Sequence, residues 1–535
     1  MNLVTATDQK LHPPDTQARS ARHLDWLLLA AILALATLVC ALHIADKTVW
    51  VDEGVSFGIS QLSWPNFFKL LARHELNMAP YYLVLRLWMN FGVSEGVLRT
   101  PSAIFFVANV AAIFLVGRRL FGTRAAAFAS LLATAHSFLI RYAQEARSYS
   151  LVAFLATLSC FFFVRNIQEP GRRTWRAYII TTALAVYSHF FALLVVLAQW
   201  ISLKFLPEDR RPGPELRRAW KILAISLLPM VVFIATRGAG PISWISRPNA
   251  TSIYYFLIFL TGNVGNSLLA AYFFLLAIAA AVLIFRRSQL AHASSVWGIL
   301  FVFSWLIVPI VVSLIFSLAR PVFLSRYLII CVPALVLLAG AALVRLPSAW
   351  LQVAVMLFLF ALSMKGVRAY YRGDFDVTRE DWRGVTKSVL AQSRPGDGLV
   401  FHAALGRMPF EYYEVRDGAG PTKPAFAFPD SGPRITPADF LANAKRAPVT
   451  TIAQNYSRIW LVLAHNQWPG RGPDDVTRTL EAGLAKNFSC SASRQFTEIQ
   501  VVLYWRGDCL NLLKPSSPPR ASDAGARHAP LRLPR

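Results

Sequence analysis

The segment Thr48-Val-Trp-Val-Asp-Glu-Gly-Val-Ser56 places two adjacent carboxylates, Asp52 and Glu53, directly after the first long apolar run of the chain. A run of about 20 apolar residues can cross a bilayer, so the pair is predicted at the far aqueous interface. Carboxylates beside a membrane core are energetically unfavourable and often mark substrate sites. Further polar residues follow at similar predicted depth, namely His74, Glu75, Glu145, Arg147, His189, Arg320 and Arg326. Together they predict an interfacial enzyme.

The composition of the whole chain is typical of a polytopic membrane protein. Its 535 residues are 55% hydrophobic, and the mean hydropathy is +0.44. The net charge of +25 is strongly positive, but most basic residues are dispersed in short loops between apolar runs. The positive-inside rule places basic residues in such loops, so the charge predicts a lipid bilayer as partner and no nucleic acid.

The apolar runs predict a polytopic α-helical membrane protein with about eleven spans. The candidate spans are 24–44, 98–116, 124–140, 148–164, 178–188, 190–205, 219–235, 267–285, 296–318, 327–344 and 348–364. One further apolar segment, 79–91, is about 13 residues long, which is closer to a re-entrant or interfacial helix than to a crossing.

The loops between these spans predict the side of the membrane that each one faces. Basic loops should be cytoplasmic, and they include 117–119, 165–176, 204–221 and 286–287. Counting from a cytoplasmic N-terminus then puts Asp52, residues 144–147, His189 and residues 320–326 on the outer side. The predicted location is the inner (plasma) membrane, with the C-terminal part extracytoplasmic.

Changes in composition divide the chain into four predicted regions. They are a cytoplasmic N-terminal segment (1–23), a transmembrane catalytic domain (24–364), a soluble extracytoplasmic domain (365–510) and a disordered basic tail (511–535). Short strand-like runs at 398–402, 459–463 and 499–504, with an amphipathic helical pattern at 474–488, predict that the soluble domain is α/β.

Cys490 and Cys509 are the two cysteines outside the apolar spans, and they bracket the strand-like run 495–505. Disulfides persist outside the cytoplasm, so we predict that these two cysteines are bonded to each other; the alternative is two free thiols. The five cysteines have no metal-site spacing, and no Gly-rich nucleotide motif occurs. A divalent cation is compatible with the sequence but not required by it, so the cofactor stays unknown.

Asp52, with Glu53 beside it, is the predicted catalytic group. A hydroxyl is a poor nucleophile until its proton is removed, and an interfacial carboxylate can act as the general base. The alternative is a helix cap or a hydrated acid in a loop. The other outward-facing polar residues favour the catalytic interpretation.

The remaining candidates each have two interpretations. Arg320 and Arg326 suit a phosphate, because guanidinium stays charged and offers a fork of donors; the alternative is that they snorkel to lipid headgroups. His189 is next to aromatic residues and has either a structural or a catalytic role. Glu145 and Arg147 either pair to orient their loop or contact the substrate.

Six short motifs occur in a characteristic order between residues 24 and 364. They are Val51-Asp-Glu-Gly, His74-Glu-Leu-Asn-Met-Ala-Pro-Tyr-Tyr82, Leu98-Arg-Thr-Pro-Ser102, Gly117-Arg-Arg-Leu-Phe-Gly122, Gln144-Glu-Ala-Arg-Ser-Tyr149 and Ser325-Arg-Tyr327. The ordered set resembles the GT-C glycosyltransferases (glycosyltransferase family 39) of the protein O-mannosyltransferase, lipid A aminoarabinose transferase and Rgt-like type.

This resemblance implies an inverting transferase that takes a sugar from a polyprenyl-phosphate carrier at the outer face of the membrane. The acceptor would be a hydroxyl of an envelope molecule such as lipid A, a glycan or a protein. Asp52 matches the family's catalytic aspartate and Glu53 its neighbour, while His74 and Glu75 fall in the substrate-binding segment. Here Asn77-Met-Ala-Pro80 replaces the family's common His-Pro-Pro, so this segment departs from the family pattern.

Two other classes of protein also have many spans and charged residues near the membrane. One is a lipid or polysaccharide transporter, in which the substrate site usually lies at the bilayer midplane between broken helices. The other is a non-enzymatic envelope scaffold. Charges gathered at one face, followed by a soluble domain, favour the transferase over the transporter.

Overall fold

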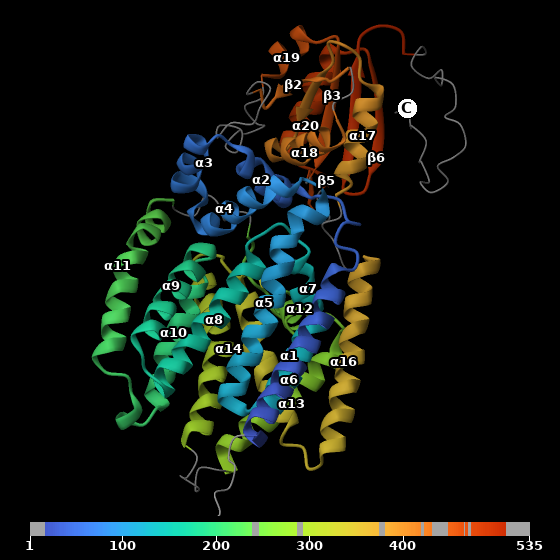
Figure 1. Cartoon of the computed structure of the whole chain (residues 1–535). Coiled ribbons are helices and arrows are strands. Elements are labelled where there is room, and N and C mark those ends of the chain that lie inside the picture. Colours follow the sequence, from blue (N-terminus) through green and yellow to red (C-terminus); the bar gives the residue numbers. More distant parts are fainter. Residues whose placement is uncertain are drawn as a thin grey trace, which may run out of the picture.

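The computed structural model consists of a bundle of helices with an α/β domain at one end (Figure 1). It describes residues 16–237, 245–285, 293–373, 380–418, 422–430, 448–464, 466–468 and 472–509. The predicted tail at 511–535, the basic pair at 286–287 and most of the segment 1–23 lie outside the described residues.

The bundle is built from helices of very different lengths. They are α1 (Thr16–Ala41), α5 (Glu95–Phe121), α6 (Thr123–Thr134), α7 (Ser137–Ala143), α8 (Tyr149–Gln168), α9 (Arg172–Ser188), α10 (Ala192–Ser202), α11 (Pro214–Arg237), α12 (Ala250–Leu260), α13 (Asn266–Phe285), α14 (Ala293–Ala319), α15 (Val332–Leu343) and α16 (Ala349–Arg372). A tight helical turn, η8 (Ser325–Cys331), leads directly into α15.

Among the described residues, seven helices are long and apolar enough to cross a membrane. The number is eight if α6 and α7, which are bent by 62° at a short break, form one span. The predicted count of about eleven spans is therefore not confirmed in the described part of the chain. Two predicted spans are α9 and α10, which have 17 and 11 residues and fall short of the about 20 that a crossing needs. The chain is a multi-pass membrane protein.

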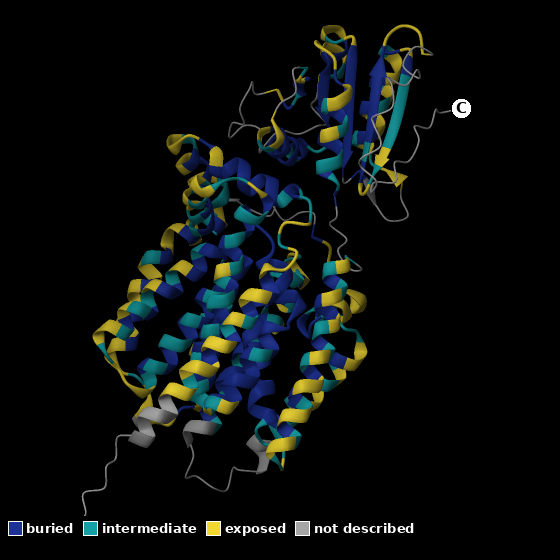
Figure 2. Ribbon diagram, turned by 45° about the vertical axis from the view of Figure 1, so that its right-hand side comes forward, coloured by how far each residue is buried: buried dark blue, intermediate teal, exposed yellow. Residues whose placement is uncertain are grey.

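Exposed residues lie along the outside of the bundle, whereas buried residues fill its interior (Figure 2). Ile225 of α11, Leu318 of α14 and Phe358 of α16 are exposed, whereas α15 is buried along its whole length. Soluble proteins rarely expose so much continuous apolar surface, so lipid is the surrounding that fits. Inside, a Cβ at Gly340 would lie 2.4 Å from the carbonyl oxygen of Ala125, so glycine allows α15 to pack directly on α6.

Short helices cover the end of the bundle and separate it from the C-terminal domain (Figure 1). They are α2 (Val51–Gln61), α3 (Trp64–Leu70), the turns η1 (Leu71–Glu75) and η2 (Leu76–Met78), α4 (Ala79–Trp88) and the turn η3 (Met89–Phe91). With 10 residues, α4 is too short to cross a bilayer. The apolar segment 79–91 is thus a short helix and a turn at the bundle end.

The C-terminal domain, residues 380–509, contains a five-stranded mixed sheet in the order β2-β1-β3-β7-β6. Its strands are β1 (Gly398–Phe401), β2 (Ala425–Phe428), β3 (Arg458–Ala464), β6 (Cys490–Phe496) and β7 (Ile499–Trp505), and a separate small ribbon is formed by β4 (Gln467–Trp468) and β5 (Gly472–Pro473). Strand β1 is parallel to β2 and β3, whereas β7 is antiparallel to β3 and β6.

Helices accompany this sheet, which confirms the predicted α/β class. They are α17 (Trp382–Gln392), α18 (Arg407–Asp417), α19 (Val449–Asn455) and α20 (Asp475–Asn487). The predicted strands overlap β1, β3 and β7, and the predicted amphipathic helix overlaps α20, which buries Leu480 and Leu484. The predicted boundary after residue 364 falls inside α16, because this helix continues past the last apolar residues to Arg372.

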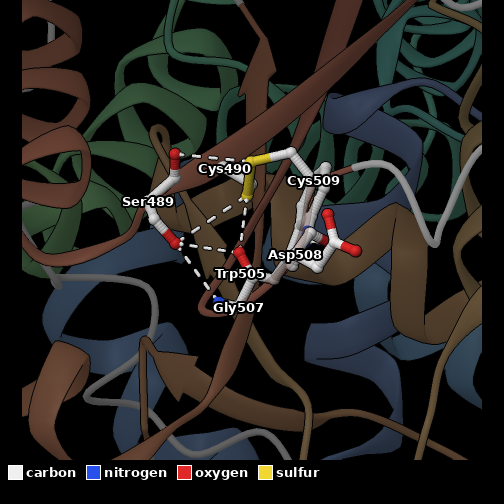
Figure 3. Close-up of a disulfide and its surroundings, with 6 residues drawn as sticks. All are labelled: Ser489, Cys490, Trp505, Gly507, Asp508 and Cys509. Atoms are coloured by element: carbon white, nitrogen blue, oxygen red, sulfur yellow. Dashed lines mark hydrogen bonds between the residues drawn. A yellow bond between two sulfur atoms is a disulfide. The ribbon is translucent and has the colours of Figure 1, made fainter.

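A disulfide joins Cys490, at the start of β6, to Cys509, which follows β7 (Figure 3). The two Cα atoms are 5.5 Å apart, within the usual range for a bridge. Because β6 and β7 form a hairpin, the bond closes its open end. The other three cysteines are buried and free.

Candidate active site

Asp52 lies in the first turn of α2, at the end of the bundle that faces the C-terminal domain. A carboxylate is favourable there, because the N-terminus of a helix carries a partial positive charge. Its side chain is 28% exposed, and Oδ2 lies 3.7 Å from Nη2 of Arg147 and 3.7 Å from Nη1 of Arg326. Three candidate residues that are remote in sequence therefore meet at one point.

Arg147 connects Asp52 to a second acid. It lies between α7 and α8, and its Nη1 donates to the backbone oxygen of Asp52 and to the hydroxyl of Tyr82, each at 3.4 Å. The Tyr82 hydroxyl donates in turn to Oε2 of Glu75 at 3.2 Å. Burial lowers the pKa of Arg147, but Asp52, Tyr82, Tyr149 and Glu75 together raise it by more, so the net shift is upward and the guanidinium stays charged.

Arg326, in η8, lies among aromatic side chains. Its guanidinium is 6.0 Å from the ring centres of Tyr149 and Tyr327, and the ring of His189 is 4.6 Å from that of Tyr327. Burial, followed by the charges of Arg326 and Arg147, lowers the pKa of His189 to about 3. This histidine is therefore neutral at neutral pH and fits a structural or hydrogen-bonding role rather than that of a proton donor.

Glu53 has a different environment from its neighbour Asp52. It is 1% exposed, and its Oε1 and Oε2 accept from Nε and Nη2 of Arg99, both at 2.8 Å. Oε1 also accepts from the backbone N–H of Ala146 at 2.9 Å. Arg99 further donates to the backbone oxygens of residues 44, 47 and 48. Glu53 thus fits a role in holding this segment in place better than the catalytic role predicted for it.

Three other candidates lie apart from Asp52. Glu145 pairs with Arg141 at 3.4 Å, because residues four apart at the end of a helix face each other. Arg320 is exposed just past the end of α14, whereas Arg326 lies in the next turn, close to Asp52. His74 is partly exposed in η1, beside Glu75.

The sequence patterns do not assign roles to Arg99, Tyr82 or Tyr149, which complete this region. Arg99 carries one usable signal, since a charge at the start of a long apolar run must find a partner. Tyr82 and Tyr149 end two of the quoted motifs, but their residue type indicates no role, because tyrosine is common at membrane interfaces whatever its role.

A cavity of about 320 Å³ lies where the bundle meets the C-terminal domain. The residues around it include Lys47, Thr48, Glu53, Arg99, Tyr371 and Asp381. It is on the Glu53 side of α2 and does not include Asp52. Among the residues that the structure describes, no three His, Cys, Asp or Glu side chains are grouped so that they could hold a metal ion.

The arrangement around Asp52 offers two chemical functions at one place. Two guanidinium groups attract an anion such as a phosphate and can bind its oxygens through paired donors. A partly exposed carboxylate can take a proton from a hydroxyl. The two ion pairs, at 3.7 Å, are longer than the about 2.7–2.9 Å of a direct charged hydrogen bond.

Comparisons with known proteins agree with this architecture. Residues 78–236 match the model of the dolichyl-phosphate-mannose-protein mannosyltransferase family. The crystal structure of ArnT from Cupriavidus metallidurans in the apo state has 16% sequence identity and a TM-score of 0.56, covering 90% of this chain and 98% of that chain. The structure of the same protein bound to undecaprenyl phosphate has 16% identity and a TM-score of 0.57, covering 89% and 97%. No curated protein matches the chain by sequence.

Proposed function

The chain has the fold of the GT-C glycosyltransferases, and from this premise we propose that it is a membrane glycosyltransferase. It moves a sugar from a polyprenyl-phosphate carrier to a hydroxyl of an envelope acceptor at the outer face of the inner membrane. The observation that carries the proposal is the position of Asp52 between Arg147 and Arg326.

Asp52, Arg326 and Arg147 have different roles in the proposed reaction. Asp52 accepts the proton of the acceptor hydroxyl while the oxygen attacks the anomeric carbon of the donor from the face opposite the phosphate. The bond from the anomeric carbon to the phosphate oxygen breaks, and the electron pair leaves with the polyprenyl phosphate. Arg326 and Arg147 offset the negative charge that develops on this leaving group. The products are an inverted glycoside and free polyprenyl phosphate.

Two features of the surroundings support these roles. Arg147 is linked through Tyr82 to Glu75, which orients the guanidinium toward Asp52. The side chain of Arg326, among its aromatic neighbours, is 20% exposed, and ion pairs with a phosphate are stronger where water is partly excluded. ArnT from Cupriavidus metallidurans, which has the same fold, has been solved bound to undecaprenyl phosphate, which supports a lipid-linked donor for this chain.

The test uses the purified full-length protein in lipid nanodiscs. A panel of polyprenyl-phosphate sugars is supplied with lipid A, glycan and peptide acceptors, and released polyprenyl phosphate is measured by mass spectrometry. We expect release from at least one donor, with dependence on one acceptor class. Absence of release from every donor, together with no measurable binding of polyprenyl phosphate, would refute the proposal.

A further inference from the structure

The segment that leads into Asp52 is bonded to the C-terminal domain. The hydroxyl of Thr48 donates to the backbone oxygen of Glu380 at 2.5 Å. The backbone N–H of Val51 donates to Oε2 of the same Glu380 at 3.1 Å. Glu380, at the start of the C-terminal domain, therefore binds the segment at Thr48 and again at Val51. Val51 immediately precedes Asp52, the carboxylate that we assign as base.

A second contact to this segment comes from Tyr413 in α18. Its hydroxyl accepts from the backbone N–H of Val49 at 2.7 Å and donates to Oε1 of Glu95 at 3.3 Å, and a phenol can do both at once. Glu95, which is buried at the start of α5, also binds Arg383 at 2.6 Å and pairs with Arg416. The same hydroxyl thus ties the segment before Asp52 to a charged cluster between bundle and domain.

The helix that carries Asp52 also touches the C-terminal domain directly. A Cβ at Gly54 would lie 2.6 Å from the backbone nitrogen of Pro409 in α18, so α2 and α18 approach backbone to backbone. Phe57 packs edge-on against Tyr412, with ring centres 5.0 Å apart. A shift of α18 would therefore move α2 with it.

These contacts supply what α2 lacks by itself. The first N–H groups of a helix have no partner within it and need an acceptor. The residue before α2 is Trp50, whose side chain provides no cap, and the first N–H of the helix, that of Val51, is satisfied by Glu380 instead. The C-terminal domain therefore acts as the N-terminal cap of the helix that bears Asp52.

We propose that the C-terminal domain fixes the position of Asp52 for catalysis, with Glu380 and Tyr413 as the positioning residues. This inference rests on the proposed function, in which Asp52 is the base. Neither residue touches the substrate in this scheme. Their effect is on geometry, and a displacement of about 1 Å at a reacting group can reduce the rate by about a hundredfold.

Two adjacent tyrosines make a matched test. Tyr412 and Tyr413 are both fully buried, but the hydroxyl of Tyr412 has no hydrogen-bond partner among the described residues. We expect Tyr413→Phe to lower kcat by about ten- to a hundredfold while the KM for the polyprenyl-phosphate donor changes less than about twofold. Backbone amides of residues 48–56 should exchange with deuterium about tenfold faster, because an opening of the segment then requires fewer broken contacts. Tyr412→Phe should change neither quantity.

A second pair of variants covers the case in which Tyr413→Phe does not fold. Glu380→Gln keeps an acceptor for the N–H of Val51, whereas Glu380→Ala removes it, so Gln should retain most of the kcat that Ala loses. Equal kcat and equal exchange in Tyr413→Phe and Tyr412→Phe would overturn the inference, as would equal behaviour of the two Glu380 variants. If the wild-type protein transfers no sugar, the proposed function fails separately, and the exchange rates still decide whether the domain holds the segment.

Discussion

The two ends of the helix bundle hold their charged residues in opposite ways. At the Asp52 end, Glu53 and Arg99 are 1% and 2% exposed and share two hydrogen bonds. At the other end of α5, Arg119 and Glu169 are 24% and 64% exposed and meet at 3.2 Å. Buried charges must be paired and so determine a local structure, whereas exposed ones are solvated and mainly mark the side of the membrane. Ion pairs thus hold a candidate site in place at one end of the bundle, whereas at the other end they mainly indicate which side of the membrane that end faces.

The largest effect should follow from removing the carboxylate of Asp52, which is partly exposed. Asp52→Asn keeps the shape but takes away the proton acceptor, so turnover should fall by about 10² to 10⁴. The rate of polyprenyl phosphate release measures it. Asp46→Asn, a few residues earlier and well exposed, is the control and should leave turnover near the wild-type value. Near-normal turnover in Asp52→Asn would show that the base is elsewhere.

The second effect concerns stability at the same end. Arg99→Ala leaves the carboxylate of Glu53 buried without its partner, which should destabilise the protein by about 3–5 kcal/mol. Thermal unfolding in detergent, followed by Tm, measures this change. The double variant Arg99→Met with Glu53→Gln removes both charges and should recover part of the loss. A single variant as stable as wild type would mean that the ion pair does not hold the segment.

The third effect concerns the Cys490–Cys509 disulfide of the C-terminal domain, which also tests the compartment that the Asp52 end of the bundle faces. The disulfide closes a short loop, so breaking it with Cys490→Ser and Cys509→Ser should destabilise the C-terminal domain by about 3 kcal/mol in the chain-entropy model. Alkylation of non-reduced protein and mass spectrometry show whether both thiols are blocked. Labelling of these cysteines in intact cells only after the inner membrane is breached would reverse the predicted sidedness of the two ends.

The fourth effect separates two arginines that the sequence alone cannot distinguish. Arg326 pairs with Asp52, whereas Arg320 is exposed past the end of α14. Arg326→Ala should weaken binding of polyprenyl phosphate by about ten- to a hundredfold, the value of one or two charge-assisted hydrogen bonds. Arg320→Ala should have a smaller effect. Titration of polyprenyl phosphate into each variant measures both, and equal losses would remove the special role of Arg326.

The comparison also shows what could be read from the sequence. The Asp52 position, the basic loops and the α/β domain follow from apolar runs and strand patterns, which are local. The different roles of Asp52 and Glu53 do not follow from local patterns. They depend on Arg326 and Arg99, which reach α2 through tertiary packing. Helix α9 begins at Arg172, six residues before the predicted span 178–188, because its first turns are polar and hydropathy does not mark them.

The smallest effect should occur at the end of the bundle opposite Asp52. Glu169→Gln breaks the contact with Arg119, but both side chains stay in water, so the stability should change by only about 0.2–1 kcal/mol and less at high salt. Turnover should not change. Glu53→Gln is the matched substitution at the other end, and there the same loss of one charge leaves Arg99 buried beside a neutral amide. When Tm and turnover are measured for both variants, Glu53→Gln should lower both quantities far more than Glu169→Gln. If both variants lowered Tm and turnover equally, burial would not distinguish the two ends. The buried pair would then not determine local structure any more than the exposed pair does.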